Sequence, residues 1–228
     1  SKKEAEQIEK DLEEATYAVH RVEKKETKRN PLPPFTTSTL QQAASQRFGY
    51  SAKMTMMAAQ RLYETGHITY HRTDSLNLSQ LALKAAEQYI TKEFGERHWA
   101  GSPRVFKTKS RGAQEAHEAI RPTDPNKTPD SLSLDSSQKK VYDLIWRRFV
   151  ASQMSHAVFD ATTIDVQAEN YTFRANGQVL KFDGYLKVYQ MKFEQADLPI
   201  VEEKEQLDCT DLISSQHFTQ PAPRFNEA

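Results

Sequence analysis

The stretch from residue 49 to residue 75 reads GYSAKMTMMAAQRLYETGHITYHRTDS, and it decides the central part of the fold. Ser51 can cap a helix that runs from Ala52 to about Glu64, because its side chain can accept hydrogen bonds from the free backbone amides of the first turn. Gly66 is the natural C-terminal stop of this helix. Its apolar side is formed by Met54, Met57, Ala58 and Leu62. The group Met54, Met56 and Met57 is interpreted as filling the core.

The residues after Gly66 are predicted to form a short strand. Side chains alternate between the two faces of a strand, so Tyr70 and Arg72 should share one face and His71 should lie on the other. A phenol beside a permanent cation suits attack on a phosphodiester, because a guanidinium binds phosphate oxygens with its planar fork and a positive charge favours the phenolate. The pair by itself also fits a surface tyrosine and arginine without any chemical role.

A helical region surrounds this stretch. Thr36, Thr37 or Ser38 can cap a helix that ends near Arg47 and is stopped by Gly49. Two helices around a tight turn, followed by a short strand, are typical of a helix-turn-helix of the winged-helix kind. Further helices are expected from the capping residue Ser79 to Gly95, with Ala82, Ala85, Ala86 and Tyr89 buried, and from about Ser136 to Ser152.

Both ends of the sequence have the patterns of β-structure. The predicted pieces are a polar helix (2–14), strands (15–22, 162–166, 185–189 and 206–212), an extended proline-rich linker (30–35) and a hairpin that turns at Asn176-Gly177. The predicted fold is therefore α+β, with a helical winged-helix-like domain (36–155) inserted into a β-rich domain formed by 1–35 and 156–228.

Composition limits the function classes. The 31 basic and 31 acidic residues cancel, whereas dedicated nucleic-acid modules are often strongly basic, so any nucleic-acid contact needs a local patch. Residues 104–111 carry four positive charges, although such a stretch also suits a solvated loop. The single cysteine, Cys209, excludes an internal disulfide and a multi-cysteine zinc site. No ligand-spaced cluster, Gly-rich phosphate loop, long apolar run or signal peptide is present, and an intracellular setting is expected.

A second group of polar residues lies in the sequence QEAHEAIRPT from residue 114 to residue 123. If this segment is helical, His117 and Arg121 lie four residues apart on one face, where they could hold a phosphate. Pro122 disfavours helix at Arg121. The alternative is a structural histidine paired with a carboxylate, for which Glu115 and Glu118 are the obvious partners.

Five stretches in order along the chain carry a family resemblance. They are PFTTSTLQ from Pro34, TMMAAQRLYE from Thr55, ITYHRTDS from Ile68, QEAHEAIRPT from Gln114 and QPAPRFNEA from Gln220. Together they closely resemble the central part of the bacterial type IA DNA topoisomerases. The form Tyr-x-Arg-Thr-Asp-Ser resembles the topoisomerase I branch rather than the topoisomerase III branch.

The resemblance implies a mechanism. The tyrosine that matches Tyr70 attacks a single-strand phosphodiester, forming a 5′-phosphotyrosyl link and releasing a 3′-hydroxyl. Another strand passes, the break is resealed without ATP, and negative supercoils are relaxed. Arg72 would position and neutralise the scissile phosphate, and His117 would hydrogen-bond a phosphate near the cut. Arg121 is a candidate for a phosphate contact or for structural support, whereas His71 varies in the family and receives no role.

The resemblance also implies what lies outside this chain. An unassisted phenol is only about one part in a thousand ionised at pH 7, and one arginine does not supply the missing stabilisation. In the family an N-terminal TOPRIM domain with acidic residues and Mg²⁺ supplies it, and none of its motifs occurs here. The chain is therefore expected to be a fragment that binds no metal itself and is inactive alone.

The expected partners are single-stranded DNA and the TOPRIM and clamp-base domains of the same polypeptide, in the cytoplasm at the nucleoid. The β-rich part would form an arch that begins the clamp base at its ends, with hinges at residues 27–35 and 153–158. Two other classes of function remain open from the residues alone. One is a non-catalytic winged-helix DNA-binding module, and the other is a β-domain for protein interaction with a helical insert.

Overall fold

The computed structural model describes residues 2–106, 117–222, 224 and 225. Two compact units are formed, and the chain passes between them several times. A sheet unit consists of residues 1–28, 158–182 and 192–224, and a helical unit consists of residues 29–157, 183–191 and 225–228. Among the described helices, none has the length and apolar character needed to cross a membrane.

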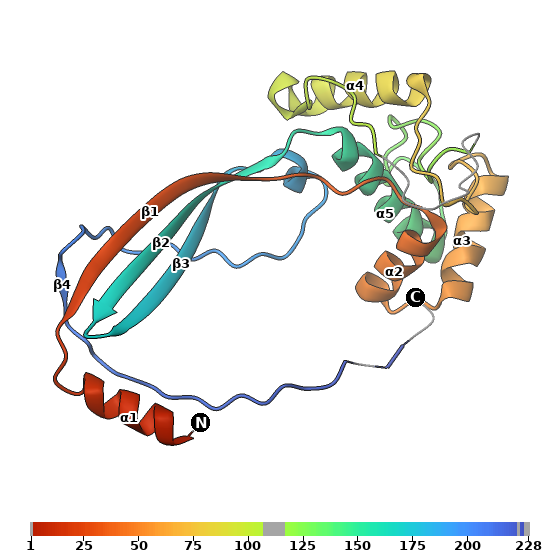
Figure 1. Ribbon diagram of the computed structural model, residues 1–228. Coiled ribbons are helices and arrows are strands. Elements are labelled where there is room, and N and C mark those ends of the chain that lie inside the picture. The colour runs from red at the N-terminus through yellow and green to blue at the C-terminus, as the bar shows by residue number, and fades with distance from the viewer. Residues whose placement is uncertain (1, 107–116, 223, 226–228) are drawn as a thin grey trace. The chain divides into compact units, whose positions relative to one another are not determined.

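The sheet unit is built on a four-stranded sheet with the order β3-β2-β1-β4 (Figure 1). The chain enters it through α1 (Lys2–Leu12), which matches the predicted polar helix. The strands are β1 (Tyr17–Arg29), β2 (Ala157–Ala168), β3 (Tyr171–Phe182) and β4 (Gln206–Leu207). β2 pairs with β3 and β1 with β4 in antiparallel fashion. The predicted strands at 15–22 and 162–166 are thus confirmed as parts of longer strands.

The hairpin predicted at Asn176-Gly177 is wrong. The β2–β3 turn lies at Glu169 and the residue after it, and β3 continues through Asn176 and Gly177, which pair with residues of β2. The glycine serves another purpose. A Cβ on Gly177 would lie 2.6 Å from the carbonyl oxygen of Ala196 and 2.7 Å from Cγ of Leu198. The glycine therefore admits a second segment of the chain close to the strand, which is its other common use in sheets.

Of two further predicted strands, one is absent and the other is shorter than predicted. Residues 185–189 were expected to continue the sheet, but Gly184–Lys187 form the 3-10 helix η2 in the helical unit. Tyr185, Leu186, Val188 and Tyr189 are all buried there, so their apolar pattern reflects burial and not strand alternation. Of the strand predicted at 206–212, only β4 is formed.

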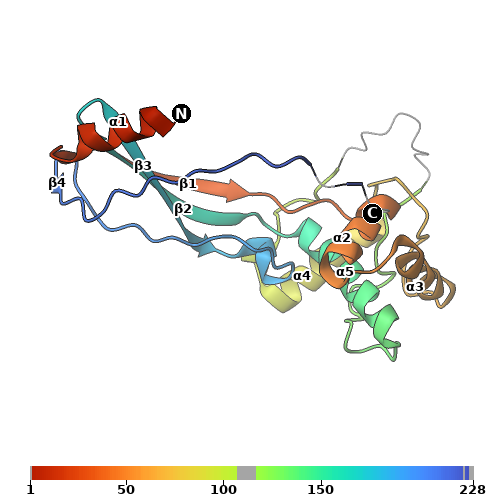
Figure 2. The ribbon, with the colours of Figure 1, turned by 90° about the horizontal axis from the view of Figure 1, so that it is seen from below.

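The helical unit contains α2 (Thr37–Phe48), α3 (Ala52–Glu64), α4 (Gln80–Phe94), the 3-10 helix η1 (Glu96–His98) and α5 (Ser136–Gln153). The predicted caps are confirmed: the side chains of Thr36, Ser51 and Ser79 accept hydrogen bonds from first-turn amides, and Gly49 ends α2 with φ 67°. α5 contacts α2, α3 and α4 and is the central helix of the unit (Figure 2).

The methionines of α3 were predicted to fill the core, and this prediction is wrong. Met54 and Met57 are exposed, and the buried face of the helix is formed by Thr55, Ala58, Ala59 and Leu62. These four residues follow the i, i+3, i+4, i+7 spacing of one helical face. Mostly small residues on this face let α3 approach α5 and α2 closely, and the longer methionines are left on the neighbouring face.

The proline-rich segment before α2 is extended, as predicted, but it is not a solvated linker. Pro31, Pro34 and Phe35 are buried. Arg148 of α5 donates from Nε to the carbonyl oxygen of Pro33 at 2.7 Å, and its guanidinium lies 4.6 Å from the centre of the Phe35 ring. The segment is therefore part of the core of the helical unit.

The fold is a mixed α/β fold with an antiparallel sheet. The helix-turn-helix of α2 and α3 is present, but the strand predicted after it is not. Outside the end of β1 and the start of β2, the described part of the helical unit has only isolated bridges, such as Phe35 with Ile120 and Ile68 with Pro122. The strands expected of a winged helix are therefore not observed in the described part of the helical unit.

Candidate active site

Tyr70 lies in an irregular segment that follows α3, with bends at Thr69, His71 and Arg72, and not in a strand, contrary to the prediction. Only Ile68 makes a bridge, to Pro122. The backbone nevertheless alternates: Tyr70 is 44% exposed and Arg72 is exposed, whereas His71 is 3% exposed. The predicted separation of Tyr70 and Arg72 from His71 is thus confirmed, although the segment does not form the predicted strand.

Side-chain hydroxyl groups hold this segment in place on both sides of the tyrosine. Thr69 donates from its backbone amide to the carbonyl oxygen of Arg121 at 2.9 Å and from its hydroxyl to that of Ala119 at 2.7 Å. Thr37, in the first turn of α2, donates from Oγ1 to the carbonyl oxygen of His71 at 2.9 Å. The backbone around Tyr70 is therefore fixed by two different parts of the helical unit.

The segment 117–123 is not helical, so the helix on which the predicted pairing of His117 and Arg121 depended is not formed. Bridges at Ile120 and Pro122, together with the restriction that proline places on the preceding residue, explain the extended backbone. His117 is exposed, and its ring centre lies 6.4 Å from that of Tyr70. The structure thus brings His117, and not Arg121, to the tyrosine ring.

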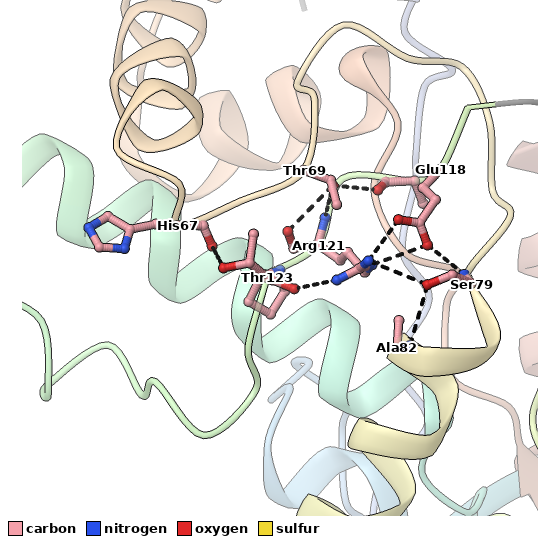
Figure 3. A network of polar contacts seen from close by, with 9 residues as sticks. His67, Thr69, Ser79, Ala82, Glu118, Arg121 and Thr123 are labelled. Carbon is pink, nitrogen blue, oxygen red and sulfur yellow. Dashed lines mark hydrogen bonds and ion pairs between the residues drawn. The ribbon is translucent and has the colours of Figure 1, made fainter.

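Arg121 is held by its own neighbours. Its side chain is 12% exposed and pairs with Glu118, Nη2 to Oε2 at 2.7 Å. The same guanidinium donates to the carbonyl oxygen of Pro122 at 3.0 Å and reaches the hydroxyl of Ser79 at 3.5 Å (Figure 3). Thr69 joins this network through the backbone of Arg121, so the network connects the tyrosine segment to the start of α4.

Glu118 is the anion of this network. Burial by itself would raise the pKa of Glu118, but hydrogen bonds from Arg121 and from the amide and hydroxyl of Ser79 outweigh burial and lower the pKa. The carboxylate accepts the backbone amide of Ser79, the capping residue of α4 (Figure 3). The alternative interpretation of His117 paired it with Glu115 or Glu118. Glu118 pairs with Arg121 instead, and Glu115 lies outside the described residues.

Arg72 and His117 line one pocket of about 470 Å³ beside the first turn of α2. The remaining lining residues are the polar Thr36, Thr37, Ser38, Gln41 and Thr73 and the acidic Asp74. Tyr70 is not among them. A pocket with an arginine, a histidine and several hydroxyl groups suits a phosphate group, which takes hydrogen bonds from all three.

Sequence reasoning missed the aromatic surroundings of Tyr70. Tyr63, at the end of α3, packs edge-on against the Tyr70 ring with centres 5.3 Å apart. His71 contacts both tyrosines, with its ring centre 5.7 Å from that of Tyr63 and 5.4 Å from that of Tyr70. Within the described residues, neither ring nitrogen of His71 has a hydrogen-bond partner. Burial, and then the charge of Arg72, lowers the pKa of His71, while Glu64 acts in the opposite direction.

The described residues offer no group of three or more His, Cys, Asp or Glu side chains that could hold a metal ion. Of the basic stretch 104–111, Arg104 donates to the carbonyl oxygen of Met154 at 3.0 Å and is thus tied to the fold. Lys107, Lys109 and Arg111, and also Glu115, lie outside the described residues.

Fold and site together define a class: a mixed α/β protein whose helical unit presents a half-exposed tyrosine beside an arginine and a histidine. The family model described as DNA topoisomerase matches residues 1–228, and the chain belongs to this family. The predicted resemblance is confirmed.

Individual relatives agree. The chain is 49% identical over 220 residues to DNA topoisomerase 1 of Vibrio cholerae, covering 95% of this chain and 25% of that protein. It is 42% identical over 246 residues to DNA topoisomerase 1 of Rickettsia felis, covering all of this chain and 32% of that protein. The full-length topoisomerase I structure from Thermotoga maritima matches with a TM-score of 0.75 and 36% identity, over 89% of this chain and 34% of that one. The chain therefore spans about a quarter to a third of these relatives.

Proposed function

We propose that this chain is the tyrosine-bearing part of a bacterial type IA DNA topoisomerase, and that Tyr70 is its nucleophile. In the proposed step the Tyr70 oxygen attacks a phosphorus atom of one DNA strand, gives up its proton, and forms a 5′-phosphotyrosyl bond. The P–O bond to the 3′ oxygen breaks, and that oxygen takes up a proton to become the 3′-hydroxyl. The 3′-hydroxyl later attacks the same phosphorus, restores the strand and frees the tyrosine. No ATP is needed, because the link preserves the phosphodiester bond energy. Passage of a strand through the break relaxes negative supercoils.

The observation that carries this proposal is the meeting of three groups. Tyr70 is half-exposed, Arg72 is exposed next to it, and the ring of His117 lies 6.4 Å from the tyrosine ring. Arg72 and His117 line the same pocket, where they would bind the scissile phosphate or its neighbour. No ion-pair partner occupies Arg72 among the described residues, so its guanidinium is available to a phosphate.

Arg121 receives a structural role in this proposal. Its guanidinium already has Glu118, the Pro122 carbonyl and the Ser79 hydroxyl as partners. A phosphate would have to compete with a carboxylate at 2.7 Å. Of the two roles expected for Arg121, support of the tyrosine segment is therefore the one we propose.

The Mg²⁺ expected in the full-length enzyme is not assigned to this chain. Within the residues that the structure describes, the acidic and histidine side chains form no cluster suited to a metal ion. The groups that complete activation of the phenol are proposed to come from a TOPRIM domain elsewhere in the polypeptide.

The finer description of the molecule is also part of the proposal. The helical domain, predicted at 36–155, would act as a winged-helix-like carrier of the tyrosine, and the β-rich part, predicted at 1–35 and 156–228, would act as an arch. Residues 29–35 and 183–191 belong to the helical unit, so the hinges, predicted at 27–35 and 153–158, would lie at the unit boundaries near residues 28–29 and 157–158. Single-stranded DNA and the TOPRIM and clamp-base domains would be the partners, at the nucleoid in the cytoplasm. Support comes from the family match and from the antiparallel sheet.

Covalent capture on the full-length enzyme tests the proposal. With a single-stranded oligonucleotide, the strand labelled at its 3′ end should stay attached to the protein, and the strand labelled at its 5′ end should be released. Tyr70→Phe should abolish both cleavage and relaxation, whereas Tyr50→Phe in the same helical unit should retain them. Undiminished cleavage by Tyr70→Phe would overturn the proposal and favour a non-catalytic DNA-binding module.

A further inference from the structure

We propose that Tyr63 is a positioning residue that orients the phenol ring of Tyr70 for attack. This inference rests on the proposed function, since it concerns the same nucleophile. It assigns a role to a residue outside the Tyr-x-Arg sequence, and it explains why an exposed aromatic side chain stands at the end of α3.

The Tyr70 side chain has no polar anchor of its own. Its backbone is fixed through Thr69, but within the described part of the chain its hydroxyl makes no hydrogen bond. Its ring is 44% exposed, so packing does not enclose it either. Rotation about the two side-chain torsions moves the phenolic oxygen by several ångströms, and in-line attack on phosphorus tolerates little of that movement.

Aromatic rings are what limit this rotation. Tyr63, His71 and His117 each meet the Tyr70 ring in an edge-on arrangement, with centres 5.3, 5.4 and 6.4 Å away and interplanar angles of 69°, 62° and 63°. Such arrangements are preferred because the positive edge of one ring faces the negative face of the other. The three rings come from three different segments of the helical unit.

Of the three, Tyr63 is the one that stands on a helix. It stands in the last turn of α3, and its carbonyl oxygen accepts the backbone amide of Gly66 at 2.9 Å. The preceding residue, Leu62, is fully buried and fixes this turn in the core. Tyr63 also packs against His71 at 5.7 Å, so one ring restrains both members of the Tyr70-His71 pair.

Rate measurements on the full-length enzyme distinguish positioning from DNA binding. At saturating single-stranded oligonucleotide, Tyr63→Ala should slow formation of the covalent link by about tenfold, the upper range for one aromatic pair. The dissociation constant for the oligonucleotide should stay within about twofold, because positioning acts on the reacting geometry and not on affinity. Tyr63→Phe keeps the ring and should restore the rate. Met57→Ala, another exposed residue of α3, is the matched control and should have no effect.

Each outcome decides the matter. Wild-type rates with Tyr63→Ala would overturn the inference, and a loss that lies wholly in DNA affinity would make Tyr63 a base-stacking residue instead. Failure of Tyr63→Phe to restore the rate would assign the effect to the hydroxyl and also overturn it. If Tyr63→Ala does not fold, Tyr63→Leu, which keeps apolar bulk without a ring, should show the same loss. Tyr70→Phe separates the two proposals: if it still forms the link, the proposed function fails, whereas a dead Tyr70→Phe beside a normal Tyr63→Ala removes only the positioning role.

Discussion

His71 is a buried imidazole that has no proposed contact with a phosphate. The alternation of the tyrosine segment turns it inward, where it meets Tyr63 and Tyr70 and has no hydrogen-bond partner among the described residues. An imidazolium in this position would be costly, because burial disfavours the charged form and Arg72 adds repulsion. Protonation of His71 at low pH should therefore destabilise the tyrosine segment directly.

Acidification is expected to loosen the segment around Tyr70. The folded-state pKa of His71 lies below the ordinary value of 6.5, so the neutral ring contributes its full stability above pH 6.5. That contribution is lost as the pH falls, since the open state takes up the proton first. Hydrogen-exchange protection of residues 68–75, corrected for intrinsic rates, should fall between about pH 7.5 and pH 5.5. His71→Leu should flatten this dependence, and His217→Leu, at an exposed histidine, should leave it unchanged. Equal pH dependence in the wild type and His71→Leu would contradict the prediction.

Gly177 is the second residue whose role depends on its surroundings. Gly177→Ala should destabilise the sheet unit by about 1–3 kcal/mol, the usual cost of forcing an extra carbon into a packed position. The new Cβ would meet the backbone oxygen of Ala196 at 2.6 Å, and a backbone atom cannot move aside as a flexible side chain can. Urea unfolding followed by circular dichroism measures this change. Thr172→Ala, on the exposed part of the same strand, should change stability by less than about 0.5 kcal/mol. A similarly small effect of Gly177→Ala would show that residues 196–198 do not press on the strand.

At the level of elements, substitutions of the two arginines of the site should have different effects, because Arg121 is paired within the fold and Arg72 is exposed. Arg121→Gln breaks a largely buried, charge-assisted network that ties the tyrosine segment to α4, and it should cost about 1–3 kcal/mol of stability. Arg72→Gln removes an exposed side chain and should leave stability nearly unchanged. In single-strand binding by the full-length enzyme, Arg72→Gln should lower the salt slope by about one contact, and Arg121→Gln should not. A reduced slope for Arg121→Gln would return this residue to the DNA-contacting group.

The elements also show where sequence patterns hold. Capping residues and stop glycines act within a few residues of themselves, and the ends of α2, α3 and α4 follow them closely. Asn176-Gly177 is an equally local signal, but the turn forms at Glu169. Gly177 instead lies within β3, where Ala196 and Leu198 pack closely against it. The prediction that the α3 methionines are buried fails for a similar reason, because the contact with α5 decides which face of α3 is buried.

At the level of the whole molecule, this chain covers about a quarter of the relative from Vibrio cholerae. The purified chain alone should not relax supercoiled DNA, because the groups proposed to activate the phenol lie elsewhere in the polypeptide. Mixing it with the remaining domains should restore covalent capture of 3′-labelled DNA, and the Tyr70→Phe chain should fail in the same mixture. Robust relaxation by the chain alone would contradict the proposal that the groups activating the phenol lie elsewhere in the polypeptide.

The sequence by itself determined the family, the capped helices and the alternation that exposes Tyr70 and Arg72 while burying His71. These features depend on neighbouring residues or on ordered motifs, and both are visible in one dimension. Only the tertiary structure decided that His117 meets the tyrosine ring, that Glu118 takes Arg121, and that Tyr63 packs on Tyr70. Such contacts depend on which segments are packed together, and packing joins residues whose separation along the chain carries no periodic signal.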